Sequence, residues 1–272
     1  MTVDLPGPFW MVGCGNMAGA MLAGWLEVGI DRAQITVIRP SGEPVGEGIR
    51  VLTRYPEDEV PALAMLGMKP YQLDEVAAAL APILEPETVL VSILAGAELA
   101  SQRARFPRVR NLVRAMPNTP VKLGKGVTGL YSDSDDPEAR ETVENLMGAL
   151  GHARWFDEET MFNIVMSLTG SGPAFLFRFI DALAAAAADL GVPEEEALEL
   201  ATAMVEGAAA LAAAAEESPA ELARAVASPG GSTRAGLDVL DRDHALRDLL
   251  KRTLAAARER SLEMAAEARR SS

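Results

Sequence analysis

The fold of this chain is decided by the stretch Phe9-Trp10-Met11-Val12-Gly13-Cys14-Gly15-Asn16-Met17-Ala18. Its first four residues are apolar and predict a buried strand, and apolar residues at helical spacing follow over residues 21–26. A Gly-x-Gly-x-x-Ala turn between a strand and a helix is typical of dinucleotide binding. Gly13 permits the tight turn, Gly15 lets the backbone approach a pyrophosphate, and Ala18 keeps the helix close to its strand. We therefore predict a nucleotide site here, with a merely tight turn as the alternative.

The next predicted strand, Ile35–Ile38, ends at Arg39 and Ser41, which bear on the choice of cofactor. An NAD site usually carries an acidic residue at this point for the ribose 2′-hydroxyl, whereas an arginine accommodates a 2′-phosphate. Arg39 and Ser41 therefore favour NADPH, with NADH as the second candidate. The alternative is that Arg39 is a solvated surface residue at a strand end.

A second glycine turn, Ser228-Pro229-Gly230-Gly231-Ser232-Thr233, opens an amphipathic run near the other end of the chain. Free amides at a helix N-terminus and the helix dipole both favour negative charge. The turn therefore suits a small carboxylate or phosphate. An ordinary loop with a tight glycine turn is the alternative.

Composition limits the classes of partner. The chain has 272 residues, 49% of them hydrophobic, and a formal net charge of −14. This charge argues against nucleic acid or an anionic membrane as the main partner. Cys14 is the single cysteine, which excludes an internal disulfide and is compatible with a reducing cytoplasm. The sequence has no signal-peptide pattern at its start, and its apolar stretches are Ala-rich, which we interpret as helices that do not span a membrane; we expect a cytoplasmic protein.

The two histidines, His152 and His244, lack the neighbours of a metal site. Each is expected to be a surface or capping residue, and we expect no metal. Neither a nucleophile elbow nor a Walker sequence is present. Metal-dependent and covalent catalysis are therefore poorly supported.

Short apolar runs alternate with helical patterns up to residue 156, which predicts βαβ units and a parallel, doubly wound sheet. The expected strands are Phe9–Val12, Ile35–Ile38, Ala62–Leu66, Thr88–Ile93, Val109–Arg114 and Ala153–Phe156, with helices over Tyr71–Leu84 and Pro137–Leu150 among them. We therefore predict a Rossmann-type dinucleotide-binding domain over residues 1–156.

Strand patterns stop after Asp157, and alanine, leucine and glutamate become abundant. Helices are predicted over Phe175–Leu190, Pro193–Ala215, Pro219–Ala227 and Arg242–Arg269. Residues 157–272 are expected to form an all-helical substrate and dimerisation domain. Its Ala-rich faces favour close packing with a second copy, in a homodimer or a higher homo-oligomer.

The ordered series of motifs resembles the pyrroline-5-carboxylate reductase family, the enzymes that form proline. The resemblance runs over nearly the whole chain. It is carried by Met11–Ala18, Met68-Lys69-Pro70, Ser92–Gly96, Arg114–Pro120, Gly170–Phe175 and Ser228–Asp241. It implies a Rossmann domain, a helical domain that makes an intertwined dimer, and reduction of a cyclic imine by a nicotinamide cofactor.

The resemblance also implies roles for individual residues. The first glycine turn would contact the pyrophosphate, a further group would border the nicotinamide, and Ser228, Ser232 and Thr233 would form the substrate loop. Amides of Gly231, Ser232 and Thr233 would then hold the substrate carboxylate, while the Thr233 hydroxyl orients the ring nitrogen as the catalytic group. The cofactor residues are Gly13, Cys14, Gly15, Asn16 and Met17 at the first turn, and Met68, Lys69, Pro70 and Ala95 at the nicotinamide side.

The chain departs from the family pattern at three places. Leu66-Gly67-Met68 replaces the usual alanine and valine before Lys69, residues 40–48 are rich in glycine and proline where a helix is usual, and Met166 replaces a threonine. Two other functions stay open at this point. One is another NADP-linked imine or F420-type reductase on the same fold, and the other is a catalytically silent nucleotide-binding regulator.

Overall fold

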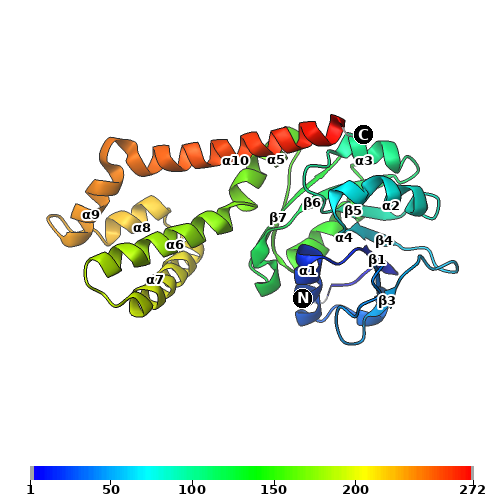
Figure 1. Ribbon diagram of the computed structural model, residues 1–272, viewed down its shortest axis with the longest axis horizontal. Coiled ribbons are helices and arrows are strands. Elements are labelled where there is room, and N and C mark those ends of the chain that lie inside the picture. The colour runs from blue at the N-terminus through cyan, green and yellow to red at the C-terminus, as the bar shows by residue number, and fades with distance from the viewer. Residues whose placement is uncertain (1–2, 271–272) are drawn as a thin grey trace. The chain divides into compact units, whose positions relative to one another are not determined.

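A computed structural model of the chain describes residues 3–270 and contains one eight-stranded sheet (Figure 1). The strand order is β3-β2-β1-β4-β5-β6-β7-β8. The strands are β1 (Phe9–Val12), β2 (Ile35–Ile38), β3 (Arg50–Leu52), β4 (Leu63–Leu66), β5 (Val89–Ser92), β6 (Asn111–Met116), β7 (Gly126–Ser132) and β8 (Gly151–Trp155).

The predicted parallel α/β sheet is confirmed. Strand β1 pairs in parallel with β2 on one side and with β4 on the other, so that Phe9 lies opposite both Ile35 and Leu63. Every residue of β1, β2, β4 and β5 is buried, as expected for strands covered by helices on both faces. The order reverses at β1, which places the carboxyl ends of β1 and its neighbours at a topological switch point.

Two strands were not predicted from the sequence. Strand β3 has only three residues and lies at the sheet edge, half-exposed, so it lacks a buried apolar run. Strand β7 contains two glycines. It pairs antiparallel with β6 on one side and parallel with β8 on the other. Glycine is depleted in strands because it offers no side chain to pack, and this hides β7 from a propensity argument.

Two apolar layers sandwich the sheet. Helix α1 (Asn16–Glu27) and helix α4 (Pro137–Gly148) cover one face, where the buried Trp25 indole donates a hydrogen bond of 2.8 Å to the Leu146 carbonyl oxygen. Helix α2 (Leu73–Leu80) and helix α3 (Leu99–Arg105) cover the other face, around Trp10 and Phe106. Helices on both faces fix the strand ends that form the site.

Helix α5 (Glu159–Thr169) is tied to the sheet by an ion pair whose arginine is buried. The Arg114 guanidinium, 3% exposed, pairs with Glu159 and lies over the Phe162 ring at 4.6 Å from its centroid. The Glu159 carboxylate also accepts a hydrogen bond of 2.7 Å from the Leu99 amide. Because both partners are anchored, α5 packs as part of the sheet layer rather than with the later helices.

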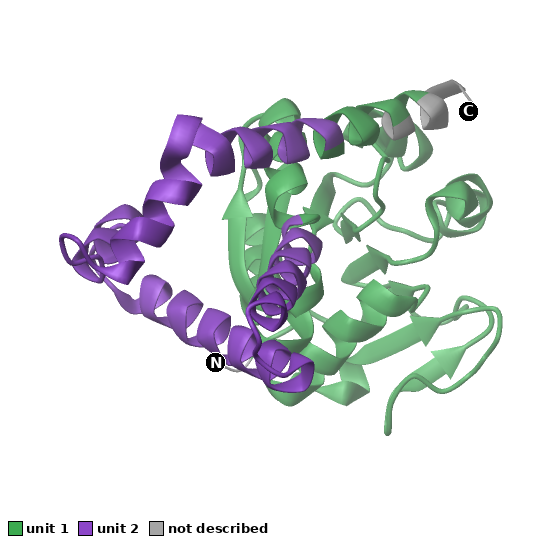
Figure 2. Cartoon of the chain, turned by 60° about the vertical axis from the view of Figure 1, so that its left-hand side comes forward, with its two compact units in different colours: residues 1–171, 257–272 green, residues 172–256 purple. Residues whose placement is uncertain are grey.

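The chain forms two compact units, shown in different colours in Figure 2. Unit 1 comprises residues 1–171 and 257–272, and unit 2 comprises residues 172–256. The sequence places a domain boundary after residue 156, where the strands end, whereas α5 and the last stretch of helix belong to unit 1 by their contacts. The functional division into residues 1–156 and 157–272 stays a prediction.

Unit 2 is all-helical, as predicted. Helices α6 and α7 pack through small residues, with Ala184, Ala197 and Ala201 buried between them. Small side chains let the two backbones approach closely. The helices are α6 (Gly172–Asp189), α7 (Glu194–Ala214), α8 (Pro219–Ala225), α9 (Ser232–Asp241) and α10 (Ala245–Arg270), of which the last continues into unit 1.

Large apolar side chains remain exposed on unit 2. Phe177 is 62% exposed, and Leu190, Leu200 and Leu211 are exposed by more than half. Two helical stretches, Glu159–Asp189 and Glu194–Ala214, are long and apolar enough to cross a membrane by length and composition alone. Large apolar side chains exposed in such number on one unit are typical of an interaction surface.

Gly151 provides a test of the β7–β8 pairing. It has a φ of +136°, and a Cβ there would lie 2.1 Å from the Gly126 carbonyl oxygen on the paired strand. Gly151→Ala should therefore lower the free energy of unfolding of unit 1 by about 1–3 kcal/mol, as measured by denaturant titration.

The matched control is Gly148→Ala at the end of α4, where a Cβ would meet no atom within 4 Å. This variant should be neutral or slightly more stable. Equal stabilities of the two variants would contradict the close approach of β7 and β8.

Candidate active site

A cleft of about 680 Å³ opens in unit 1 at the carboxyl ends of the central strands. It brings together all of the residues predicted for the cofactor. They are Gly13, Cys14, Gly15, Asn16, Met17, Arg39, Ser41, Met68, Lys69, Pro70 and Ala95. Residues separated by more than 80 positions meet here because parallel strands end at one edge of the sheet.

The first turn has the geometry that a pyrophosphate requires. Gly13 adopts a φ of +84°, and a Cβ at this position would lie 2.7 Å from the backbone nitrogen of Met68. At Gly15, in contrast, a Cβ would meet no atom within 4 Å, so the backbone borders open space. Gly15 is also the N-cap of α1 and supplies no side chain to satisfy the first amides of the helix. These amides are left to an anionic ligand, and the turn therefore fits a dinucleotide.

Gly67 explains one departure from the family pattern. A Cβ on Gly67 would lie 2.9 Å from the Ala18 Cβ and 2.9 Å from the Gly13 carbonyl oxygen. The Gly67 amide donates a hydrogen bond of 2.8 Å to the Val12 carbonyl oxygen, extending the β1–β4 ladder. The end of β4 therefore lies directly beneath the first turn, and the following residues, Met68 and Lys69, border the cleft.

The other end of the cleft contains a second departure. Residues 40–48 form turns and extended backbone without a helix. The Arg39 amide donates a hydrogen bond of 2.9 Å to the Leu52 carbonyl oxygen of β3, so the ends of β2 and β3 lie side by side. Three cleft residues that the sequence analysis did not identify follow β3, namely Thr53, Arg54 and Tyr55. The sequence signal for these three residues is weak, because they can be assigned to the cleft only once the three-residue edge strand before them is recognised.

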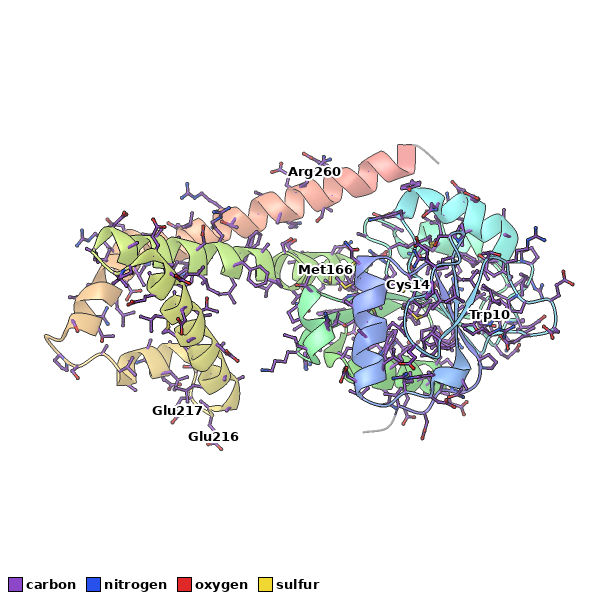
Figure 3. The ribbon with its side chains drawn as sticks, turned by 60° about the horizontal axis from the view of Figure 1, so that its bottom comes forward. Trp10, Cys14, Met166, Glu216, Glu217 and Arg260 are labelled. Atoms are coloured by element: carbon purple, nitrogen blue, oxygen red, sulfur yellow. The ribbon has the colours of Figure 1, made fainter. Side chains whose placement is uncertain are left out.

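Two titratable side chains in the cleft are uncharged near neutral pH. Burial raises the pKa of the Cys14 thiol, and the Arg39 charge opposes this effect only in part. Burial, with a smaller contribution from Glu75, raises the pKa of Tyr55 to about 12. The Tyr55 ring stacks on Trp10 with centroids 6.0 Å apart. Figure 3 labels Trp10 and Cys14, at β1 and in the turn that follows it.

A second cavity of about 270 Å³ adjoins the cleft, since Ala95 lines both. It is lined by residues from the Arg114–Pro120 segment and from α5, including Met116, Pro117 and Met166. The side chain of Asn118 fastens this segment with two hydrogen bonds. Its Nδ2 donates to the Thr169 carbonyl oxygen at 2.9 Å, and its Oδ1 accepts from the Val127 backbone amide at 2.8 Å. Asn118 therefore holds this wall of the cavity in place.

The substrate loop predicted from the sequence lies in unit 2. The Gly231 amide donates a hydrogen bond of 3.0 Å to the Ser228 carbonyl oxygen, and Gly230 adopts a φ of +72°. Helix α9 starts at Ser232 with Gly231 as its N-cap and without a side-chain cap. Ser232 and Thr233 therefore occupy the first turn of the helix, with their amides at its positive end.

The neighbouring arginine does not contribute a free charge to this loop. Arg234 pairs with Asp238 at 2.7 Å and with Asp241 at 3.2 Å. Both partners lie on the same helix, at spacings that place them on one face with Arg234. Anion binding at the loop would depend on backbone amides and hydroxyl groups.

Comparisons with known proteins identify the family of the chain. A family model described as pyrroline-5-carboxylate reductase dimerisation matches residues 159–264. A pyrroline-5-carboxylate reductase of Pseudomonas aeruginosa is 37% identical over 261 residues, covering 93% of this chain and 95% of the relative. One from Haemophilus influenzae is 32% identical, covering 93% and 96%.

Solved structures give the same result for the fold. A pyrroline-5-carboxylate reductase from Coxiella burnetii has a TM-score of 0.89 and 30% identity, covering 96% of this chain and 99% of that one. A pyrroline carboxylate reductase from Plasmodium falciparum with NADP bound has a TM-score of 0.81 at 22% identity, covering 96% and 98%, and shares the fold.

The dimerisation region indicates a homo-oligomer, and the family together with the cleft indicates binding of a nicotinamide dinucleotide. The coverage extends across both units, so the resemblance is not confined to the widespread dinucleotide fold. On these grounds the chain belongs to the pyrroline-5-carboxylate reductase family of oxidoreductases.

Proposed function

We propose that this chain reduces 1-pyrroline-5-carboxylate to L-proline with NADPH, as a cytoplasmic homodimer. The observation that carries the proposal is the cleft, which gathers the first glycine turn, Arg39 and Lys69 around open space. Family membership supplies the substrate class. The test is an assay of the purified chain with pyrroline-5-carboxylate and NADPH, following the nicotinamide absorbance. Oxidation of NADPH that depends on the imine supports the proposal, and its absence refutes it.

The residues of unit 1 bind and orient the cofactor in this proposal. Free amides of Asn16 and Met17 at the start of α1 hold the pyrophosphate, and Arg39 with Ser41 holds the 2′-phosphate. The end of β4 and Ala95 of the next strand border the nicotinamide. When bound, the cofactor supplies the hydride that reduces the imine carbon.

The substrate loop binds the imine. The amides of Gly231, Ser232 and Thr233 hold its carboxylate, and the Thr233 hydroxyl aligns the ring nitrogen. The protonated imine already carries the proton that ends on the product nitrogen, so the chain needs no strong general acid. Both histidines are exposed, and neither is among the residues that line the cleft. The contribution of the protein is therefore position, with reacting atoms held within roughly 3–3.5 Å.

Gly15 tests the cofactor site. Its φ of −81° is available to any residue, and the space around its Cβ position is open. Gly15→Val should therefore fold normally but place two methyl groups where the pyrophosphate lies. We expect NADPH affinity to fall at least about tenfold, corresponding to roughly 1.4 kcal/mol, in a titration of binding.

Gly19→Ala serves as the control, because Gly19 lies in the same helix, α1. A Cβ at this position would lie 3.8 Å from the Cys14 sulfur, an ordinary van der Waals contact. It should bind NADPH as the parent does. Unchanged binding by Gly15→Val, at an unchanged melting temperature, would exclude this turn as the pyrophosphate site.

Thr233 tests the substrate loop. Its side chain is exposed, and Gly231 is the N-cap of α9, so the hydroxyl has no capping role in the described part of the chain. Thr233→Ala should lower kcat/KM by roughly ten- to a hundredfold, a loss of about 1–3 kcal/mol, and leave NADPH affinity and melting temperature nearly unchanged.

The control, Thr202→Ala, also removes an exposed hydroxyl from unit 2. The Thr202 hydroxyl donates to the Leu198 carbonyl oxygen of its own helix at 2.8 Å, so its loss should leave the kinetics unchanged. A Thr233→Ala variant that is less stable but kinetically normal would show that Thr233 is structural.

Phe177 tests the homodimer. A phenylalanine that is 62% exposed in the dimerisation region is expected to be buried by the second copy, in an interface on the order of 2,000 Å² or more. Light scattering should give the mass of a dimer for the parent chain, and Phe177→Asp should shift it towards the monomer with loss of activity.

Leu123→Asp is the control, since Leu123 is 75% exposed on unit 1. It should leave the mass unchanged. A parent chain that is monomeric and active at assay concentration would refute the dimer.

A further inference from the structure

Arg39 and Ser41, the two residues predicted to bind the 2′-phosphate, already contact a carboxylate of the same chain. Arg39 Nη2 lies 2.9 Å from Glu43 Oε2, and the Ser41 hydroxyl donates to the same Glu43 oxygen at 3.3 Å. One carboxylate oxygen thus accepts from both groups expected to recognise the phosphate. The carboxylate stands where a phosphate oxygen would bind.

The loop is built to return Glu43 to this position. The Gly42 amide donates a hydrogen bond of 3.1 Å to the Arg39 carbonyl oxygen, closing a tight turn. Gly42 adopts a φ of +64°, which favours glycine, and a Cβ there would lie 3.1 Å from the Thr53 Cγ2 atom. The Glu43 amide in turn donates to the Ser41 hydroxyl at 3.3 Å. A helix over residues 40–48 would direct this carboxylate elsewhere.

The contact can open when a stronger anion arrives. The Glu43 side chain is 69% exposed and that of Arg39 is 24% exposed, and exposed ion pairs of this kind are weak. A phosphate monoester carries more charge and offers several acceptor oxygens to the guanidinium. The exposed Arg54, on the cleft wall after the neighbouring strand, adds a second positive charge at this end.

The same carboxylate suits a nucleotide that lacks the phosphate. An acidic residue at the end of the second strand normally accepts a hydrogen bond from the ribose 2′-hydroxyl in NAD sites. Glu43 lies in the loop after this strand, and its ion pair with Arg39 holds its carboxylate near the strand end. It can therefore keep its contact with Arg39 and accept from the hydroxyl with its second oxygen.

We infer that Glu43 is a specificity-determining residue, which occupies the 2′-phosphate subsite and narrows the preference of the chain for NADPH over NADH. NADPH must displace the carboxylate, whereas NADH retains it. Arg39 and Arg54 then hold the phosphate together. This inference rests on the proposed function, because it requires the dinucleotide to lie in the cleft.

The experiment measures the dissociation constants of NADP⁺, NAD⁺ and 2′,5′-ADP by calorimetry, without turnover. Glu43→Gln should bind NADP⁺ and 2′,5′-ADP roughly three- to tenfold more tightly than the parent, because the competing charge is removed. Its affinity for NAD⁺ should be unchanged or lower. Arg54→Gln should lose affinity for the two phosphorylated ligands and retain it for NAD⁺.

Two controls separate the local contact from general charge. Glu47→Gln removes one exposed negative charge from the same loop and should leave the NADP⁺ to NAD⁺ ratio of the parent unchanged. In an Arg39→Gln background the Glu43→Gln change should lose its effect, since the competition is for Arg39. Melting temperatures confirm that each variant is folded.

The outcomes are distinguishable. The role of Glu43 is overturned if Glu43→Gln leaves the ratio of NADP⁺ to NAD⁺ affinity unchanged, or shifts it no more than Glu47→Gln does. The proposed function would then still stand. Weaker NADP⁺ binding by Glu43→Gln also overturns it, because Glu43 would then support the phosphate site. A parent chain that binds neither nucleotide overturns the proposed function and this inference together.

Discussion

The close approach of two backbone segments beneath helix α1 is the constraint on which the cleft depends. Strand β4 ends directly under the first glycine turn, at distances that leave no room for a Cβ on Gly13. Gly67 meets Ala18 and the Gly13 carbonyl oxygen equally closely. The start of α1 therefore packs directly against the sheet, and its free amides lie beside the strand ends, where they border the cleft.

The charge distribution shows how an acidic chain binds anionic ligands. The formal net charge is −14, yet the cleft presents Arg39, Arg54 and Lys69 together with unpaired amides at a helix N-terminus. Local dipoles and a few cations determine the potential within a cleft, whereas net charge governs long-range association. Glu43 belongs to the same balance, because it neutralises one of these cations from within the chain.

Unit 2 has a different energetic basis. Its buried cluster consists largely of alanines, and many of its leucine and phenylalanine side chains are exposed. Such a unit buries little apolar surface by itself, so its stability depends on what covers the exposed faces. The dimerisation region matched by the family model coincides with these helices. Burial of these faces by a second copy is therefore expected to stabilise unit 2.

The sequence by itself determined the alternating α/β layer, the helical unit, the first glycine turn and the family. These features depend on apolar periodicity and on local glycine positions, which are properties of short segments. Only the tertiary structure revealed strands β3 and β7, because a three-residue edge strand and a glycine-containing strand lack a local signature. It also decided that Glu159 joins Arg114, and that Glu43 returns to Arg39. Both contacts depend on where backbone segments meet in space, and the spacing of residues along the chain does not fix such meetings.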